Sequence, residues 1–285
     1  MLRLAGATDE KTYERMCDPL ADRDIEARHL PTAERTIPLD ADLGAFDAGF
    51  IFPPRVAEGG VASELLGVPW VNGREAILRS RHKGETLARL SRAGLPIPET
   101  VVVSDPVDES DLVAAFERFD PPVVVKPNAT TRGIGVAKAD DLDSFLGICD
   151  YLDLVHDYRA TGDRSFLVQE YLPEARDYRA MCIDGEYVGA VQRRLPDDAL
   201  AAGQWKHNVH RGAEATGVDL PDDLRRLAER AAAAMEIPFL GVDLLVSDGR
   251  PVVNETNARP TIDDATKYEP GFYDDLAALI RSTVG

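Results

Sequence analysis

The sequence predicts a mixed α/β protein in which a small parallel α/β lobe comes first and an antiparallel sheet comes last. Three observations predict this order. Short apolar runs alternate with helical patterns in roughly the first 70 residues, a second alternation follows, and strand–turn–strand patterns begin near residue 165. The chain has 285 residues, of which 44% are hydrophobic and 29% charged, so it is long enough to bury a sizeable core.

The first lobe starts with an apolar run over residues 2–5 that ends at Gly6, and a polar helical pattern continues to about residue 20. Strand-like stretches follow at 25–29 and 46–52. Strands that alternate with helices predict a parallel sheet. Because the first strand-to-helix turn carries a single glycine, it is not a dinucleotide-binding fingerprint.

One helix is predicted over residues 72–93. Asn72 is placed to cap it, Glu75 stands three residues later, Gly94 ends the pattern and Pro96 follows. The next elements are a strand over 100–103, a helix over 111–119, a strand over 123–126, a loop over 130–135, a further strand, and a helix over about 142–155.

From residue 165 onward the pattern is typical of antiparallel strands. Strands over 178–183 and 186–193 flank an Asp184-Gly185 turn, which predicts a hairpin. The other elements are a strand over 166–172, an aperiodic surface loop over 195–214, a helix over 222–235, a second hairpin over 241–246 and 251–257, and a helix over 273–283. We therefore expect three parts, over residues 1–75, 76–165 and 166–285.

The charge balance is strongly acidic, since 50 Asp and Glu residues against 32 Lys and Arg give a net charge of −18. Nucleic acid and anionic membranes both need a basic face, so neither is an expected partner. The acidity is spread along the chain, which is typical of a solvated surface. It also suits a cytoplasm rich in salt, where the screening length shrinks to about 3 Å at 1 M, so we hypothesise a halophilic source.

Several classes of protein are excluded by what the sequence lacks. It has no run of 18 apolar residues and no signal-peptide pattern, so we expect no membrane span and a cytoplasmic location. Three scattered cysteines suit a reducing compartment. His207 and His210 lack further zinc ligands nearby, and no nucleophile elbow or Cys–His pair indicates a covalent hydrolase.

The last predicted hairpin carries three oxygen-bearing side chains, Asp243, Glu255 and Asn257. Glu255 and Asn257 are two residues apart, so they share one face of a strand. An odd-length loop, with Gly249 at positive φ, would place Asp243 on the same face, whereas a two-residue turn would place it on the other. Such a set suits Mg²⁺ held partly by substrate phosphates, and the alternative is a solvated polar face.

A lysine at the end of a β-branched strand, Lys126, precedes a loop that contains hydroxyls and glycines. Thr131, Gly133 and Gly135 lie in this loop, whose N–H groups are able to close on phosphate oxygens. Lys126 is then a phosphate ligand, or else only an edge charge. The sequence has no G-x-x-x-x-G-K-[ST] stretch, so this is not a Walker A loop.

Two further features allow both a binding role and a structural one. The strand that ends at Glu170 and Tyr171 would offer main-chain groups to a flat base edge, unless it is a plain hydrophobic strand. The default interpretation of a basic cluster near 179–211 is a solvated loop, and the acidic background of the chain favours contact with an anion as the alternative. Its members are Arg179, Arg193, Arg194, Lys206 and Arg211, with Asn208 nearby.

In this order the motifs resemble those of the ATP-grasp superfamily. They begin with Lys83 on a helix and end with Glu255-x-Asn257. Within that superfamily, the stretches S-R-x-K, V-V-V-K, G-I-G-V, Q-E-Y, D-Y-R, N-V-H-R-G, G-V-D and E-T-N-A resemble the RimK-like α-L-glutamate ligases. The resemblance covers roughly residues 65–260, and the lobe before it fits the small N-terminal domain of that family.

The resemblance implies an ATP-grasp fold in which ATP lies between a central lid and a C-terminal antiparallel sheet. It implies that Lys83 and Lys126 contact the phosphates and the adenine side, that Glu170 and Tyr171 present main-chain groups to adenine, and that Asp177 lies near the ribose. It places Lys206 and Asn208 at the phosphate end, and Mg²⁺ or Mn²⁺ on Asp243, Glu255 and Asn257. The candidates for gripping the acyl phosphate and substrate carboxylates are Arg193 and Arg211, with Arg179 and Arg259 as further substrate-binding candidates.

The activity implied is an ADP-forming carboxylate–amine ligation through an acyl phosphate. We expect L-glutamate as the amino acid and a protein C-terminus, a cofactor or a small peptide as the acceptor. The alternatives are a ligase for another amino acid, as in glutathione or amino-group carrier pathways, and a nucleotide-binding relative without catalysis. A binding-only relative is free to lose Asp243 or Glu255, and this chain keeps both. The sequence leaves a homo-oligomer open.

The chain departs from the family pattern at three places. Thr130 stands where relatives often have Gly, the stretch 195–203 is longer than usual, and Arg259-Pro260-Thr261 replaces the usual small residue, Pro and Gly. Arg259 either binds a substrate carboxylate or braces its loop. These departures bear on the specificity for the amino acid and the acceptor rather than on the ATP chemistry.

Overall fold

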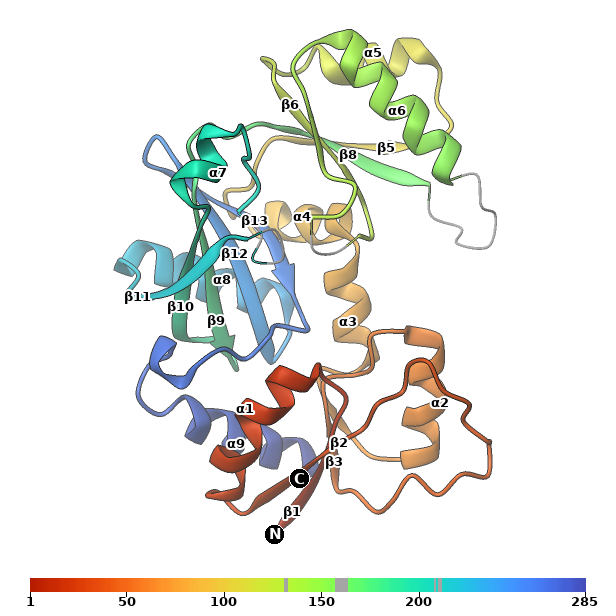
Figure 1. The fold of residues 1–285 in the computed structure, drawn as a ribbon, viewed down its shortest axis with the longest axis vertical. Helices are drawn as coiled ribbons and strands as arrows, with labels where there is room; N and C mark the ends of the chain where they lie inside the picture. The colour runs from red at the N-terminus through yellow and green to blue at the C-terminus, as the bar shows by residue number, and fades with distance from the viewer. Residues whose placement is uncertain (131–132, 157–163, 208, 210–211) are drawn as a thin grey trace.

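The computed structural model describes residues 1–130, 133–156, 164–207, 209 and 212–285. Across these ranges the strands form three sheets, each with its own helices (Figure 1). In the view of Figure 1 the N-terminal lobe lies lowest, the middle sheet lies at the top, and the C-terminal sheet lies between them on the left. The mixed α/β class predicted from the sequence is confirmed.

The N-terminal lobe is a parallel sheet in the order β2–β1–β3–β4. Its elements are β1 (Leu2–Gly6), α1 (Glu10–Ala21), β2 (Ile25–His29), β3 (Ala48–Phe50), α2 (Val56–Leu66) and β4 (Trp70–Val71). Asp9 begins α1 by accepting the amide of Thr12 at 3.0 Å, and Met16 and Leu20 are buried on one side of the helix. The predicted parallel lobe is confirmed, although the sequence pattern did not predict α2 and β4.

The last helix, α9 (Phe272–Val284), completes this lobe from the other end of the chain. It packs against α1, β3 and β4. The hydroxyl of Tyr273 donates to the carbonyl of Arg15 at 2.9 Å. Both chain ends therefore lie in the same lobe (Figure 1).

The single helix predicted over residues 72–93 is wrong. Two helices occupy this stretch, α3 (Arg74–Arg81) and α4 (Lys83–Arg92), because His82 between them is extended, with φ −91° and ψ 106°. The amides of Lys83 and Gly84 donate to the carbonyl and the side chain of Asn128 at 3.1 and 2.9 Å. These two donors at the start of α4 are satisfied by the middle sheet rather than by a preceding helical turn.

Asn72 joins two lobes and does not cap a helix. It has a φ of 53°, is 1% exposed, and leaves the N-cap position of α3 to Gly73. Its side chain donates to the carbonyl of Ala258 at 2.7 Å and accepts the amide of Phe239 at 3.1 Å. One buried amide thus ties the end of the N-terminal sheet to the C-terminal sheet.

The middle sheet is antiparallel in the order β5–β8–β6–β7. Its strands are β5 (Thr100–Ser104), β6 (Val123–Pro127), β7 (Ala137–Ala139) and β8 (Ser165–Glu170). Helices α5 (Glu109–Phe116) and α6 (Leu142–His156) cover one face around a core that includes Phe116, Phe145 and Phe166 (Figure 1). β8 pairs with β5 and β6 and so belongs to this sheet. The sequence pattern had instead placed a strand over 166–172 at the start of the C-terminal part.

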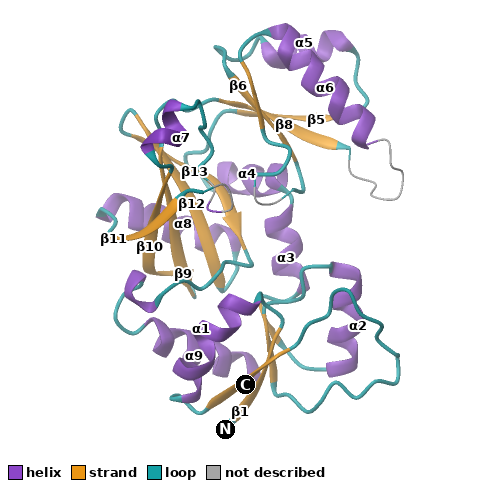
Figure 2. Cartoon of the chain, viewed as in Figure 1, coloured by secondary structure: helices purple, strands orange, loops and turns teal. Residues whose placement is uncertain are grey.

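The C-terminal sheet is antiparallel in the order β11–β10–β9–β12–β13. Its strands are β9 (Arg176–Ile183), β10 (Glu186–Arg194), β11 (Glu214–Val218), β12 (Phe239–Ser247) and β13 (Arg250–Asn257), and α8 (Asp222–Met235) packs on one face (Figure 2). The predicted Asp184-Gly185 turn is confirmed, since both residues have positive φ. The stretch predicted as a loop over 195–214 contains a helix, α7 (Asp197–Ala201). β11 begins at Glu214, the last residue of this stretch. A 3-10 helix, η2 (Ala265–Lys267), precedes α9.

Cys17, Cys149 and Cys182 are free thiols. Burial raises the pKa of Cys149 and of Cys182 to about 12, so neither is a nucleophile at neutral pH. Within the ranges that the structure describes, no helix combines the length and apolar character needed to span a bilayer.

Candidate functional site

A cavity of about 300 Å³ lies between the middle sheet, the C-terminal sheet and the start of α4. β6 and the residues after β8 supply one wall, β9, β10, β12 and β13 supply a second, and residues 200 and 204–207 supply a third. The cavity gathers many residues singled out from the sequence, namely Lys83, Lys126, Gly133, Glu170, Tyr171, Asp177, Arg193, Lys206, Asp243 and Glu255.

The other predicted site residues fall into two groups. Those that the structure describes but that do not line the cavity are Gly135, Arg179, Asn257 and Arg259. Those that lie outside the described residues are Thr131, Asn208 and Arg211. Arg179 and Asn257 border the cavity, because Arg179 binds Asp243 and Asn257 follows Glu255 on β13.

Lys126 is a buried cation on β6. It is 5% exposed, and its ammonium donates to Oδ1 of Asn254 at 3.1 Å. Burial lowers the pKa of Lys126 to about 8, the charge of Glu255 opposes this change, and the charge of Lys83 adds to it. A buried lysine with one neutral partner is placed to receive an anion.

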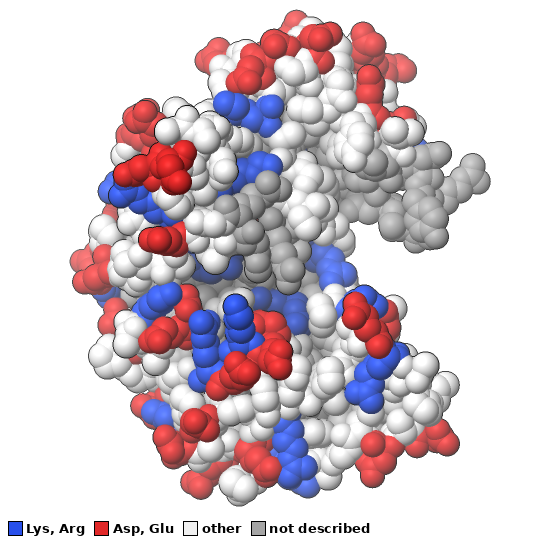
Figure 3. Space-filling model, in the orientation of Figure 1, with Lys and Arg blue, Asp and Glu red and all other residues white. Residues whose placement is uncertain are grey.

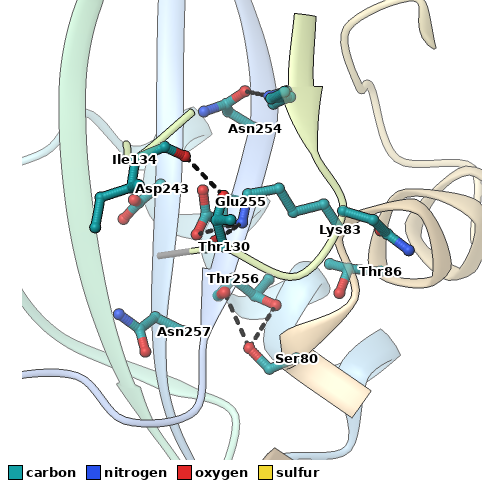
Figure 4. A network of polar contacts seen from close by, with 12 residues as sticks. Ser80, Lys83, Thr86, Thr130, Ile134, Asp243, Asn254, Glu255, Thr256 and Asn257 are labelled. Atoms are coloured by element: carbon teal, nitrogen blue, oxygen red, sulfur yellow. Dashed lines mark hydrogen bonds and ion pairs between the residues drawn. The ribbon is translucent and has the colours of Figure 1, made fainter. Parts of the chain in front are cut away.

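Lys83 and Lys206 hold the two ends of the loop that follows β6. The ammonium of Lys83, at the start of α4, donates to the carbonyl of Thr130 and lies 3.7 Å from Oε1 of Glu255 (Figure 4). The ammonium of Lys206 donates to the carbonyl of Val136. The described ends of this loop are therefore fastened from two different walls of the cavity.

The chain after β8 presents an unpaired main-chain edge. The carboxylate of Glu170 accepts the amide of Glu99 at 2.7 Å and a guanidinium N–H of Arg250 at 3.0 Å, so its side chain holds the strand in place. Among the described residues, the amides of Tyr171 and Leu172 find no hydrogen-bond acceptor. The ring of Tyr171 meets that of Trp205 edge-on at 5.8 Å. A main-chain edge beside two aromatic rings suits a planar base.

The last hairpin places Asp243 opposite Glu255 by an unexpected route. Its turn is the two-residue Asp248-Gly249, flanked by the pair Ser247 and Arg250, so of the two turns considered from the sequence the structure has the shorter one. A bulge lies between the pairs Leu244–Val253 and Asp243–Glu255 and leaves Asn254 unpaired in the ladder. Residues directly opposite in a ladder share a face. The extra residue therefore places Glu255 on the same face as Asp243, whereas the two-residue turn with a regular ladder would place it on the opposite face (Figure 4).

Asp243 is 5% exposed and is held by two arginines. Arg179 donates to both of its oxygens, at 2.6 and 2.8 Å, and Arg193 lies 3.0 Å from Oδ2. Burial opposes ionisation of Asp243, but the two guanidiniums outweigh it and lower its pKa to about 2. Arg193 also binds Asp177 at 2.5 Å, and burial nevertheless raises the pKa of Asp177 to about 6.

The oxygen donors of this face fit a hard divalent cation. In the part of the chain that the structure describes, no cluster of three His, Cys, Asp or Glu side chains is present, so a structural zinc site is not supported. Asp243 and Glu255 supply two carboxylates and Asn257 supplies an amide oxygen that accepts the amide of Arg259 at 2.9 Å. Mg²⁺ or Mn²⁺ takes few protein carboxylates and completes its shell with phosphates and water. From the residues that the structure describes, Oδ1 of Asp243 accepts only the bond from Arg179, so it keeps a lone pair for a cation.

Several lining residues were not predicted from the sequence. Val124, Val136, Leu172, Leu200 and Leu245 make the cavity partly apolar. Asn254 was missed because its role depends on the bulge, which no periodicity within β13 alone shows. The aromatic Trp205 inside a polar stretch was the available signal for the third wall.

A protein-family model described as the RimK-like ATP-grasp domain matches residues 80–274 of this chain. The chain belongs to the RimK-like ATP-grasp family. Among its relatives is a "Probable alpha-L-glutamate ligase 2" of Shewanella frigidimarina, 34% identical over 243 residues, covering 79% of this chain and 74% of that protein. Another is the "Ribosomal protein bS6--L-glutamate ligase" of Escherichia coli, 32% identical, covering 72% of this chain.

This RimK-like chain spans about two thirds of the length of several such relatives, for example 64% of the "Probable alpha-L-glutamate ligase" of Enterobacter sp.. Solved structures share its fold over almost its whole length. A RimK domain ATP-grasp protein of Sphaerobacter thermophilus has a TM-score of 0.71 at 24% identity, covering 99% of this chain and 98% of that one. D-cycloserine synthetase DcsG has a TM-score of 0.76 at 19% identity, covering 99% and 100%.

Proposed function

We propose that this chain is an ATP-dependent, ADP-forming carboxylate–amine ligase that joins L-glutamate to an acceptor carboxylate through an acyl phosphate. The observation that carries the proposal is the convergence of Lys83, Lys126 and Lys206 with Asp243 and Glu255 in one cavity. Such a set suits a nucleoside triphosphate and its divalent cation. The names of the relatives as L-glutamate ligases support the choice of amino acid.

Each wall of the cavity has its own task in this proposal. The main chain at Glu170 and Tyr171 faces adenine, and Asp177 lies near the ribose. The three lysines hold the phosphates, and Thr131, Gly133, Gly135 and Asn208 close on the nucleotide. Asp243, Glu255 and Asn257 would hold Mg²⁺ or Mn²⁺, which would neutralise phosphate charge. Arg193 and Arg211 grip the acyl phosphate, and Arg179 positions Asp243 beside it.

The reaction has two steps, phosphoryl transfer and amide formation. An oxygen of the acceptor carboxylate attacks the γ-phosphorus of ATP, the bond to the bridging oxygen breaks, and ADP leaves. The amine of glutamate then attacks the acyl carbon and loses a proton, phosphate leaves, and an amide remains. Lysine and arginine charges stabilise the transferred phosphoryl group. Walls that close around the bound substrates would exclude water, which would otherwise hydrolyse the acyl phosphate.

For the acceptor we propose a protein C-terminal carboxylate, because one named relative acts on a ribosomal protein. A ligase for a different amino acid is the second candidate, since Arg259 departs from the family pattern next to the metal-binding residues. We also propose a cytoplasmic location, which suits the three free cysteines.

For the division into domains expected over 1–75, 76–165 and 166–285 we propose one change. The second boundary follows Glu170, because β8 pairs within the middle sheet.

The test is an ADP-release assay in which amino acids are crossed with acceptor carboxylates, at KCl concentrations from low to molar. We expect release that depends on glutamate, on one acceptor class and on Mg²⁺ or Mn²⁺. Glu255→Ala should lower the rate at least ~100-fold, because it removes a carboxylate beside the phosphates. Bound ATP without turnover for any pair would favour nucleotide binding without catalysis, and full turnover by Glu255→Ala would refute the metal assignment.

A further inference from the structure

Two arginines beside the N-terminal lobe lack an acidic partner. They are Arg81, which ends α3, and Arg259, two residues after β13. Within the described residues neither lies within ion-pair distance of an Asp or Glu, and the guanidinium contacts of both are to main-chain carbonyls. The chain carries a net charge of −18, so carboxylates are abundant. Two neighbouring guanidiniums without an ion pair are therefore unexpected in it.

The two side chains start from adjoining points. The hydroxyl of Ser80 donates to the carbonyl of Thr256 at 2.9 Å (Figure 4). It also accepts the amide of Ala258 at 3.1 Å. Arg81 follows Ser80 in the chain and Arg259 follows Ala258. The end of α3 and the segment after β13 are therefore fastened together one residue before each arginine.

Both guanidiniums reach the same segment of the N-terminal lobe. Arg81 donates to the carbonyl of Pro54 at 2.6 Å. Arg259 donates to the carbonyl of Phe52, and to that of Ala7 at 2.9 Å. Ala7 follows β1 and Phe52 lies two residues after β3.

This place is the topological switch point of the parallel sheet. β1 lies between β2 and β3 and pairs with both in parallel. The chain therefore leaves β1 toward one side and later returns on the other. In open α/β sheets such a reversal marks the crevice at the carboxyl ends of the strands where ligands bind. Here the guanidinium of Arg259 reaches the carbonyls of Ala7 and Phe52, which follow β1 and β3.

The electrostatics at this switch point favour an anion. A guanidinium stays protonated at any ordinary pH, and Arg259 is partly buried, so a shielded cation lies near the cationic Arg81. A partly buried charge without an ion-pair partner is costly, and a bound anion removes that cost.

We propose that Arg81 and Arg259 bind a carboxylate of one of the two organic substrates in the crevice between the ends of β1 and β3. This rests on the proposed ligase function. Two N–H groups of the Arg259 guanidinium donate to carbonyls. A guanidinium has five N–H donors, so three remain for a two-bond contact with a carboxylate. The amide of Arg259 also donates to Oδ1 of Asn257 at 2.9 Å, which fixes this subsite relative to the metal-binding residues.

The carboxylate bound here is one that does not react. It comes either from the incoming amino acid or from a second acid group of the acceptor. Kinetics with amide analogues distinguish these sources, because replacing the recognised carboxylate by an amide removes one charge and little volume. The wild type should bind the free acid better than its amide analogue. The substrate for which the arginine variants lose this difference is the source of the carboxylate.

The main variant is Arg81→Gln, because Arg81 makes only one contact to the N-terminal lobe and its loss should leave the fold intact. Arg259→Lys keeps a positive charge and Arg259→Gln does not. A difference in KM between these two variants reports recognition of the ligand, whereas an equal effect reports bracing of the lobe. Arg28→Gln is the control in the same lobe, since Arg28 is exposed and pairs with Glu26. We expect Arg81→Gln to raise KM for one organic substrate ~10–100-fold, with KM for ATP changed less than about twofold.

Unchanged KM values for both organic substrates in Arg81→Gln and Arg259→Gln would overturn the proposal, as would an equal rise in KM for ATP. A second measurement does not depend on turnover. Thermal unfolding of the wild type is followed with L-glutamate, its two monoamides, and an acidic peptide with a free or amidated C-terminus. A stabilising shift that needs one carboxylate and is lost in Arg81→Gln supports the subsite even if no ADP is released. No shift with any of these probes, in an enzyme without turnover, rejects the subsite together with the function.

Discussion

Lys126 shows what burial does to one side chain of the cavity. Its pKa falls to about 8, chiefly because burial disfavours the ammonium, whereas an exposed lysine stays charged to much higher pH. Phosphate oxygens nearby would favour the charged form and raise the pKa again. Nucleotide binding at this lysine is therefore coupled to proton uptake at mildly alkaline pH.

From this coupling we predict that ATP affinity is constant below pH 8 and falls as pH rises above 8, by up to about tenfold per unit. The same group has the opposite effect on folding. Its folded pKa lies below its unfolded value, so its contribution to stability grows as pH rises from about 8 to the unfolded pKa. Calorimetric titration with ATP between pH 7 and 10 measures the first effect.

The matched variants are Lys126→Arg and Lys126→Ala. Lys126→Arg keeps its charge across this range, so its affinity should vary less with pH than that of the wild type. Lys126→Ala should weaken ATP binding ~10–100-fold at pH 7, because a charged hydrogen bond to phosphate is lost. An affinity unchanged by Lys126→Ala would show that this lysine does not touch the nucleotide.

His207 is a second residue whose protonation state is fixed by a neighbour. Its Nδ1 accepts the amide of Leu195 at 3.2 Å, so the neutral ring carries its proton on Nε2. Burial and the charge of Arg193 lower its pKa. The ring lines the cavity together with Leu200 and Trp205, so this bond anchors the stretch that forms the third wall.

We predict that His207→Asn, whose side-chain oxygen replaces Nδ1 as acceptor, keeps ATP affinity within about threefold, while His207→Phe weakens it ~10-fold. As pH falls, the wild type should lose the anchoring bond, since protonated Nδ1 no longer accepts. The contribution is present above the unfolded pKa and is lost as pH falls toward the lowered folded one. Nucleotide affinity of the three proteins at pH 5 and pH 7.5 checks this, and equal values for Asn and Phe would contradict it.

At the scale of elements, the bulge in β13 decides which side chains face the cavity. With the two-residue turn Asp248-Gly249, a regular ladder would direct Asp243 and Glu255 to opposite faces. Asn254 adds one residue and brings them to the same face. The same residue accepts the ammonium of Lys126 at 3.1 Å, so the bulge connects the sheet to the middle lobe as well.

Insertion of one glycine between Asn254 and Glu255 should therefore abolish ADP formation while leaving a folded C-terminal sheet, because Glu255 would move one position along the ladder and turn away from Asp243. Asn254→Ala is the control, since it keeps the bulge and loses only the contact to Lys126. We expect Asn254→Ala to retain turnover within ~10-fold and the insertion to lose it by more than ~100-fold. Circular dichroism verifies the fold, and normal turnover by the insertion variant would contradict this account of the bulge.

The elements also show where prediction from the sequence stops. The parallel lobe and the Asp184-Gly185 hairpin were predictable because periodicity and turn chemistry are local. The break at His82 was not, because the partner that starts α4, Asn128, is 44 residues from Gly84. The placement of β8 failed for the same reason, since strand pairing is a long-range choice that local propensity does not contain.

The candidate site followed the same rule. Lys83, Lys126 and Lys206 were found because lysine is rare in this chain and each stands in a motif. The apolar lining and the wall around α7 were missed, because each depends on which segments meet across the cavity. The unpaired state of Arg81 was invisible as well, since only the folded chain shows that no carboxylate of the described residues reaches it.

At the scale of the whole molecule, charge is distributed unequally. Acidic side chains are scattered over the outer parts of the face in Figure 3, whereas several basic ones lie in the hollow between the lobes. The cations that line the cavity are Lys83, Lys126, Arg193 and Lys206, and the lining also contains the carboxylates of Glu170, Glu174, Asp177, Asp243 and Glu255. The acidic exterior repels anionic substrates, and salt weakens this repulsion by screening it.

This arrangement predicts that salt stabilises the fold. The net charge of −18 repels itself across the surface, and the screening length falls from about 10 Å at 0.1 M to about 3 Å at 1 M. The unfolding temperature should therefore rise by at least ~2–4 °C between 0.1 and 1 M KCl, corresponding to about 1 kcal/mol for a chain of this size. Sucrose at equal osmolality is the control, because it stabilises by exclusion without screening charge. An unfolding temperature that is highest at low salt would remove the basis for a halophilic source, and an equal rise in sucrose would show that screening is not the cause.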